Sequence, residues 1–215
     1  SLGTIISGRG VYRLSAKALD EHPEIEDIQS KGHKFDVGTG AFQKLEGIVF
    51  FKEKPLDNHE YVRFLGLMKG KRVWYWARKD FQDPPDSFYT FKVFIPEANG
   101  SGALGEVLST PLIGAPLIGA TETFLSIGAF ATEREAANCL KYVKSKFARA
   151  MLGVLKITQH NTREKWAYVP LQDFSSSSDI DWSQSVAEID RQLYAKYGLS
   201  AEEIAFIESH VKEMA

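Results

Sequence analysis

The chain has 215 residues, of which 44% are hydrophobic and 25% charged; this is the composition of a folded globular protein and argues against extensive disorder. The single cysteine, Cys139, excludes an internal disulfide, so we expect a cytoplasmic location rather than a secreted, disulfide-stabilised fold. The net charge of −2 is unevenly distributed: residues 61–170 carry 15 basic and 9 acidic residues, whereas residues 171–215 carry 3 and 9. This distribution predicts a middle segment that faces a polyanion, followed by an acidic tail.

The first part of the chain is predicted to consist mainly of strands. Residues 16–30 have a short helical pattern that Pro23 interrupts. Aromatic and β-branched runs bounded by turn residues predict strands at residues 47–51, 72–77, 89–95 and 123–130.

Residues 109–132 form an apolar stretch long enough to suggest a membrane span. Glu122 lies within it, and prolines and glycines recur through a repeated PLIGA sequence. A central carboxylate and repeated helix breakers are both unfavourable in a membrane-spanning helix. We therefore predict a buried loop that leads into a core strand, and no membrane partner.

A long helix is predicted after this loop. Thr132 and Glu135 have the spacing of a capping box. Apolar residues then recur at helical intervals, namely Leu140, Val143, Phe147, Met151 and Val154. The pattern predicts one helix of about 20–25 residues, with residues 166–170 forming a strand against it.

Two further helices are predicted after a run of four serines, residues 175–178, which we interpret as a hinge. Gly198 has the position of a C-capping glycine between them, and Ser200 with Glu203 repeats the capping-box spacing.

The predicted fold class is therefore α+β. We expect a mixed, largely antiparallel β domain with one long central helix in residues 1–174. A C-terminal helical tail is expected in residues 175–215.

No complete catalytic constellation is found. The sequence Asp83-Pro84-Pro85-Asp86 resembles the DPPY motif of adenine methyltransferases, but a carboxylate in fourth place cannot stack on a flipped base. A Pro-Pro turn is the preferred interpretation. No acidic residue has Lys two positions later, as common metal-dependent nucleases require, and no GxSxG motif exists. We predict no catalytic residue, cofactor site or metal site in this chain.

A basic arm is the strongest candidate binding feature. Residues 138–165 hold seven cations and one acid, Glu164. The five cations on the predicted helix fall outside its apolar arc, which is typical of a solvated helix face and also suits a cationic face for phosphate groups. The seven are Lys141, Lys144, Lys146, Arg149, Lys156, Arg163 and Lys165.

Polar residues follow this helix directly. Gln159 and Asn161 can pair with adenine and Arg163 with guanine, and His160 lies among them. Phosphate-anchoring cations beside base-reading groups are typical of DNA recognition. A second candidate is the basic turn Lys69-Gly70-Lys71-Arg72, which enters the aromatic run Trp74-Tyr75-Trp76. It could hold a phosphate and stack a base, or be half core and half surface packing.

Four segments of the second half carry a resemblance to a known family. They read TETFLSIGAF, AANCLKYVKSKFARAMLGVLKITQH, YVPLQDF and LYAKYGLSAEEIAFIESHVKEM. Together they resemble the C-terminus of bacterial type II restriction–modification proteins, which are adenine-specific DNA methyltransferases, some of them fused to an endonuclease. The likeness covers residues 121–215, with a looser match at FKVFIPEANGSG. The serine-rich insertion after VPLQDF departs from the family pattern.

The resemblance implies a DNA target-recognition domain of a longer cytoplasmic enzyme. Methyl transfer from S-adenosylmethionine, with or without DNA cleavage, would belong to an N-terminal methyltransferase or nuclease domain outside this chain. Double-stranded DNA and that domain are the expected partners. The alternatives are a non-catalytic scaffold that docks a methyltransferase or nuclease subunit, and, with no recognisable site to support it, an independent small enzyme.

Overall fold

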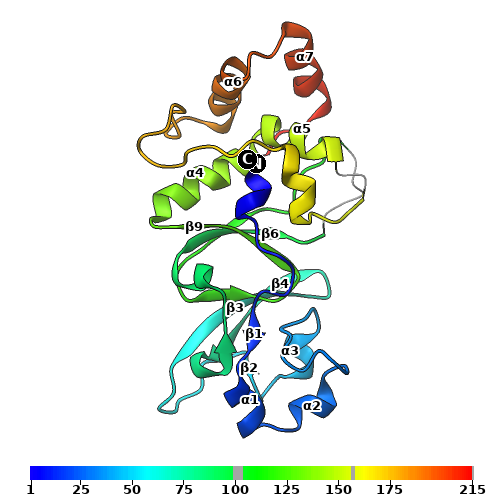
Figure 1. The fold of residues 1–215 in the computed structure, drawn as a ribbon, viewed down its shortest axis with the longest axis vertical. Coiled ribbons are helices and arrows are strands. Elements are labelled where there is room, and N and C mark those ends of the chain that lie inside the picture. The colour runs from blue at the N-terminus through cyan, green and yellow to red at the C-terminus, as the bar shows by residue number, and fades with distance from the viewer. Residues whose placement is uncertain (99–103, 156–157, 215) are drawn as a thin grey trace.

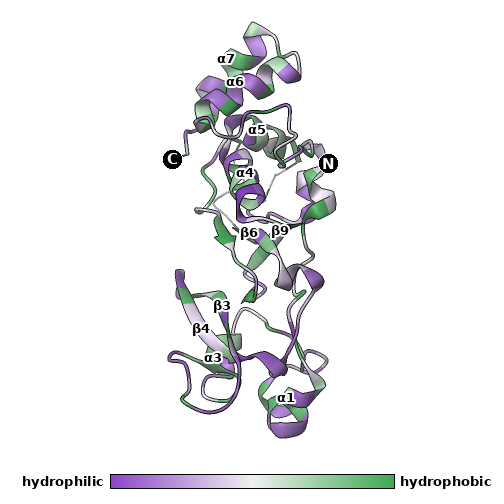
Figure 2. Ribbon diagram, turned by 90° about the vertical axis from the view of Figure 1, so that its left-hand side faces the viewer, coloured by the Kyte–Doolittle hydropathy of each residue, from purple (hydrophilic) through white to green (hydrophobic). Residues whose placement is uncertain are grey.

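The computed structural model describes residues 1–98, 104–155 and 158–214. The molecule is elongated, with α6 (Val186–Lys196) and α7 (Ala201–His210) at one end and α1 (Ala16–Glu21) at the other (Figures 1 and 2). It contains helices and largely antiparallel sheets, so the predicted α+β class is confirmed.

A four-stranded sheet dominates the N-terminal half. Its strand order is β2-β4-β3-β8, with β2 at Phe50–Phe51, β3 at Tyr61–Met68, β4 at Lys71–Arg78 and β8 at Ile118–Ala120. Short helices α1, α2 (Ile25–Ile28) and α3 (Ala41–Lys44) contribute to the same core, as do β1 (Arg13–Leu14), η2 (Lys79–Phe81) and β5 (Gln82–Asp83). Pro84 and Pro85 connect β5 to η3 (Asp86–Tyr89), in which Phe88 is buried; Pro85 has an extended conformation, with ψ of 163°.

A three-stranded sheet, β7-β6-β9, separates two hydrophobic cores. Its strands are β7 (Leu112–Gly114), β6 (Phe91–Pro96) and β9 (Phe124–Phe130). Because side chains alternate along a strand, Phe94 packs into the N-terminal core, while Val93 and Ile95 face the C-terminal core. The apolar stretch at residues 109–132 thus supplies strands to both sheets, and no helix among the described residues is long and apolar enough to cross a membrane.

The predicted long helix is two helices. The capping box at Thr132 and Glu135 starts α4 (Glu133–Lys144), as predicted. Ser145 then takes an extended conformation, with ψ of 148°, and α5 (Lys146–Leu155) begins after it. The single-helix prediction was wrong because the period of apolar residues continues across Ser145 while the backbone does not.

The helical tail belongs to the C-terminal core. Buried tail residues such as Ile189, Leu193 and Ile207 pack in one hydrophobic cluster with Phe147 and with Leu2 of η1 (Leu2–Ile5). The serine run therefore does not separate two independent cores, contrary to the predicted division at residue 175. Gly198, with φ of +62°, and the Ser200–Glu203 capping box lie as predicted.

Two local predictions were wrong. Residues 166–170 form no strand; the 3-10 helix η4 (Arg163–Tyr168) occupies most of this segment. Conversely, β3 is an eight-residue strand that the sequence did not predict. Its central residues are buried on both faces, so the alternation that marks a half-buried strand is absent.

Candidate nucleic-acid interface

The β3–β4 hairpin is the longest strand pairing in the fold. Its register runs from Tyr61↔Arg78 to Met68↔Lys71. The two turn residues, Lys69 and Gly70, have φ of 51° and 74°. Positive φ at both central residues is the geometry of the two-residue turns that match the twist of a hairpin. The turn is therefore short and fixed in direction.

The distal half of the hairpin extends beyond the sheet. β2 pairs with β4 only at Ala77 and Trp76, and β8 pairs with β3 only from Arg63 to Leu65. Within the described part of the chain, residues 67–72 have no strand beside them. Leu67, Met68 and Val73 still pack against the N-terminal core, and the ribbon ends in a turn where Lys69 and Lys71 are exposed.

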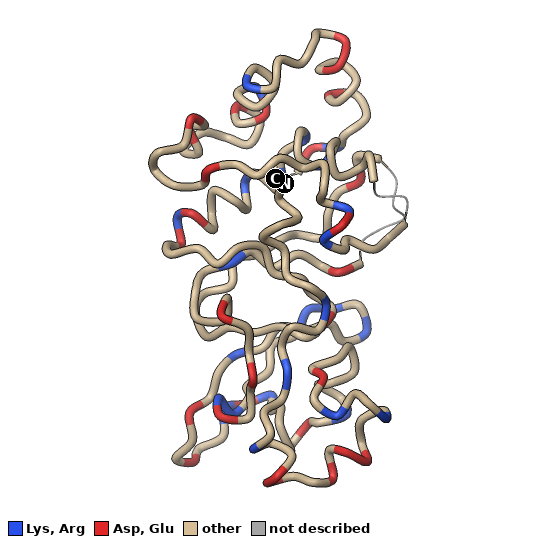
Figure 3. The backbone as a smooth tube through the Cα atoms, viewed as in Figure 1, with Lys and Arg blue, Asp and Glu red and all other residues tan. Residues whose placement is uncertain are grey.

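The hairpin contains five cations and no carboxylate. They are Arg63, Lys69, Lys71, Arg72 and Arg78. Figure 3 shows the basic residues at the hairpin turn and the acidic residues that predominate along α6 and α7. The five cations differ in their intramolecular contacts, and those contacts determine which side chains are accessible to a ligand.

The Arg78 and Arg63 side chains make intramolecular contacts that stabilise the fold. The Arg78 guanidinium lies 3.8 Å above the Phe81 ring and is bonded by Asp80 and Glu21. Arg63 lies over the rings of Trp74 and Trp76, at 5.2 and 4.8 Å.

These arginine contacts bear on the two interpretations of the aromatic run. The Trp74 and Trp76 rings lie against Arg63. Both side chains are half-buried. The contacts favour packing over base stacking, and the exposed cations of the hairpin lie at its tip.

Arg72 connects the hairpin to the second candidate segment. Its guanidinium donates to the Thr110 carbonyl and lies 5.6 Å from the centre of the Phe124 ring. Phe124 pairs with Pro96 in the central sheet, and the Pro96 carbonyl accepts a 3.0 Å hydrogen bond from Asn161. The ends of β6 and β9 therefore join the hairpin to the segment before η4, and in Figure 1 they lie between β4 and the yellow η4.

Asn161 is fully buried and cannot read a base. Its backbone N–H donates to Glu97 O at 2.6 Å, its side-chain amide to Pro96, and its own carbonyl accepts from Trp166 Nε1 at 3.2 Å. The prediction for this residue was wrong because the side chain ties the segment to the end of β6.

The neighbours of Asn161 remain accessible. The Gln159 and Arg163 side chains are exposed, and Lys165 is half-exposed. His160 is also exposed and places Nδ1 2.9 Å from a Glu97 carboxylate oxygen. Lys156 lies outside the described residues.

Two lysines of the predicted cationic helix face hold the tail. The Lys141 ammonium donates to the carbonyls of Trp182 at 2.7 Å and Gln184 at 3.0 Å. The Lys146 ammonium pairs with Glu208 on α7. Neither is a free phosphate anchor, because the tail packs across this face.

Arg149 is buried as well, with 2% of its surface exposed. Its Nε donates to the Lys144 carbonyl at 3.1 Å, and its Nη atoms donate to the carbonyls of Glu106 and Lys212. Burial lowers the pKa of this guanidinium. Lys144 is half-buried and has intramolecular contacts of its own. The prediction that Arg149 lies on an exposed basic face was wrong.

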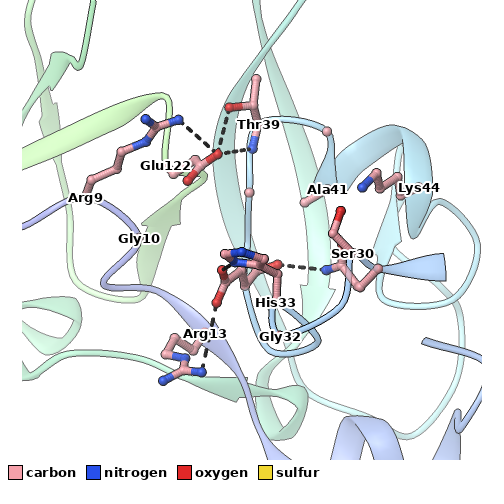
Figure 4. A pocket seen from close by; sticks show the side chains of 14 residues that line it. Arg9, Gly10, Arg13, Ser30, Gly32, His33, Thr39, Ala41, Lys44 and Glu122 are labelled. Carbon is pink, nitrogen blue, oxygen red and sulfur yellow. Dashed lines mark hydrogen bonds and ion pairs between the residues drawn. The ribbon is translucent and has the colours of Figure 1, made fainter. Parts of the chain in front are cut away.

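A polar pocket of about 790 Å³ lies beside the N-terminal core (Figure 4). Glu122 accepts hydrogen bonds from Thr39 N at 3.0 Å and Thr39 Oγ1 at 2.9 Å, and Arg9 lies 3.2 Å away. Although burial opposes it, these contacts hold the pKa of Glu122 below its usual range. The Glu122 carboxylate therefore connects the loop at residues 38–40 to the segment just before β9.

The same pocket holds a His–Asp pair. His33 Nδ1 lies 2.6 Å from Asp36 Oδ2, and 66% of the His33 side chain is exposed. Ser30, the nearby hydroxyl residue, accepts at its backbone carbonyl from His33 N. No hydrogen bond between the Ser30 hydroxyl and the His33 ring is found among the described contacts. No group of three His, Cys, Asp or Glu side chains in the described ranges could hold a metal ion.

Comparison with known proteins gives no relative: no family model, no curated protein and no solved structure matches this chain. The resemblance of residues 121–215 to restriction–modification proteins therefore stays a prediction.

Proposed function

We propose that this chain binds double-stranded DNA through the tip of the β3–β4 hairpin and the segment at residues 159–165. The observation that carries this proposal is the carboxylate-free hairpin whose turn exposes Lys69 and Lys71. A two-stranded ribbon fits the B-DNA major groove, which is about 12 Å wide. The short turn fixes the backbone positions of both lysines, so DNA binding would not have to order this loop.

In this proposal the cationic side chains and the polar side chains of the two segments have different roles. Lys69, Lys71, Arg163 and Lys165 contact phosphates and supply affinity that depends on salt. Gln159 and His160 are the exposed polar side chains beside them and probe base edges. The acidic α6–α7 end lies away from the phosphate backbone, which would repel it.

The salt dependence of duplex binding tests this proposal. We expect the Lys69→Ala/Lys71→Ala variant to lose about tenfold or more in affinity. The slope of log Kobs against log salt should fall by about 2, one for each phosphate contact. The matched control is Lys31→Ala/Lys212→Ala, which removes two exposed lysines elsewhere and should leave the slope unchanged.

Two results would contradict the proposal: duplex binding by the wild-type chain that does not depend on salt, or equal slopes for the hairpin and control variants. Tighter binding to single strands than to duplex would assign the surface to another nucleic acid. Selection from a randomised duplex library tests base reading separately, since Gln159→Ala should relax the preference at one position and leave total affinity for random DNA unchanged.

On the sequence resemblance, we further propose that recognition serves an adenine-specific methyltransferase domain outside this chain, in the cytoplasm. That domain would bind S-adenosylmethionine and carry the catalytic residues. Reading the gene for the methyl-donor and methylation motifs tests this part. Their absence, together with unmethylated adenine in the host DNA, would contradict it and leave the DNA-binding proposal standing.

A further inference from the structure

An apolar groove lies between α5 and α7. It has a volume of about 650 Å³. Its walls are Phe147, Ala150, Met151, Gly153 and Val154 of α5, Glu202, Glu203, Phe206 and Ile207 of α7, and Leu104, Pro170, Tyr197 and Leu199 from connecting segments. The groove is formed by the tail packing against α5, and it lies apart from the β3–β4 hairpin.

Large apolar side chains are exposed along this groove. Val154 is 58% exposed, Phe206 48%, Leu104 41% and Tyr197 40%. These are four of the ten large hydrophobic residues exposed among the described parts of the chain. Single exposed hydrophobic residues are ordinary, but a contiguous group that lines a concave surface marks an interaction site.

The charge around the groove is negative. Glu202 and Glu203 are its charged lining residues in the described ranges. Residues 171–215 as a whole carry 9 acids and 3 bases; Glu208, farther along α7, is paired with Lys146. This charge repels DNA. It also disfavours a second copy of the chain, because a two-fold contact would bring the same glutamates together.

We propose that this groove docks an amphipathic helix of a partner protein, with apolar residues on one face and Lys or Arg at the edges. A helix laid beside α7, a ten-residue helix, spans about 15 Å and presents two or three apolar anchors at helical spacing. Basic residues at its edges would meet Glu202. The proposal stands independently of DNA binding.

Designed peptides test the proposal with the whole chain. The probe is a fluorescein-labelled helix of about 18 residues with Leu on one face and Lys on the other. We expect it to bind at least about tenfold more tightly than the same peptide with Glu for Lys. A Lys peptide with Ser for Leu should not bind.

Matched variants locate the binding. Val154→Ser should weaken the Leu–Lys peptide about tenfold, whereas Tyr89→Ser, at a residue 57% exposed elsewhere, should not. Glu202→Lys should remove the preference for the basic peptide. Glu203 is left unchanged because its side chain caps α7. A thermal melt shows that each variant is folded.

Three outcomes overturn the proposal. Equal affinity for the Lys and Glu peptides removes the charge argument, and unchanged binding by folded Val154→Ser places the peptide elsewhere. Self-association of the wild-type chain that Val154→Ser abolishes would assign the groove to a second copy.

Discussion

The carboxylate of Asp190 accepts a 2.9 Å hydrogen bond from the backbone N–H of Phe147, across 43 residues of sequence. Its other oxygen accepts from Lys146 N at 3.0 Å. The Ser145 hydroxyl accepts from Ala148 N, and the Ser145 carbonyl accepts from the next amide. All four amides that open α5 are thus bonded, and a buried residue of the tail supplies two of the acceptors.

Replacing Asp190 should therefore loosen the tail. We expect Asp190→Ala to lower the free energy of unfolding by about 2–3 kcal/mol, because two buried amides lose their acceptor. Urea denaturation measures the loss. The control is Glu188→Ala on the same helix, whose partner Arg191 has a side chain 73% exposed; it should cost less than about 0.5 kcal/mol. Equal losses would mean that the cap contributes nothing.

Gly105 allows the last turn of α7 to pack closely. A Cβ here would lie 2.2 Å from the His210 carbonyl oxygen and 2.7 Å from Val211 Cα, and φ is +73°. Both the left-handed backbone and the backbone contact oppose any side chain. We expect Gly105→Ala to cost about 3 kcal/mol of unfolding free energy.

Gly32 separates the two effects. Its φ is +82°, but a Cβ would meet nothing within 4 Å. Gly32→Ala should therefore cost only the backbone term, about 1 kcal/mol. Similar midpoints of urea denaturation for the two variants would show that the contact at Gly105 relaxes freely.

The Arg78–Asp80 pair should make stability depend on pH. Hydrogen bonds from Arg78 hold the pKa of Asp80 well below its usual range, against the effect of burial, and Lys17 adds to the shift. The ionised carboxylate is thus favoured by folding. Its stabilisation is complete above the pKa of about 3.9 in an unfolded chain and is lost as the pH falls toward the lower folded value.

We therefore expect Asp80→Asn to lower the free energy of unfolding at pH 7 by about 1 kcal/mol, because the carboxylate is partly exposed and water screens the pair. The difference from wild type should shrink below about pH 4. A stability difference that stays constant from neutral to acidic pH would contradict this assignment.

The turn of the hairpin permits a test that separates stability from binding. Lys69 has φ of 51°, a conformation that Asn adopts more readily than Lys. We expect Lys69→Asn to raise the unfolding free energy by about 0.5 kcal/mol and to lower DNA affinity through loss of one charge. Lys71→Asn should lower DNA affinity similarly without the gain in stability. Parallel denaturation and DNA titrations of both variants would show whether the two effects are separate.

Much of the helical structure could be predicted because its signals are local. The capping boxes at Thr132 and Ser200 and the left-handed Gly198 were identified from residues at most a few positions apart. Their hydrogen bonds close within one turn of the chain, so the sequence alone contains both partners.

The break at Ser145 and the strand β3 could not be predicted in this way. The acceptor for the Phe147 amide, at the start of α5, is the Asp190 carboxylate, which is 43 residues away in the sequence. β3 is buried at its centre, in the same hydrophobic cluster as Phe42 of α3, so the sequence shows no alternation. In both cases a distant segment completes the element.

The sequence by itself determined the fold class, the capped starts of α4 and α7 and the concentration of cations in the middle of the chain. Only the tertiary structure decided which of those cations remain accessible. The tail covers Arg149 and holds Lys141 and Lys146, whereas Lys69 and Lys71 are exposed on a short turn. Helical periodicity reports which side of a helix is apolar, but it does not report whether another segment of the chain packs over the polar side.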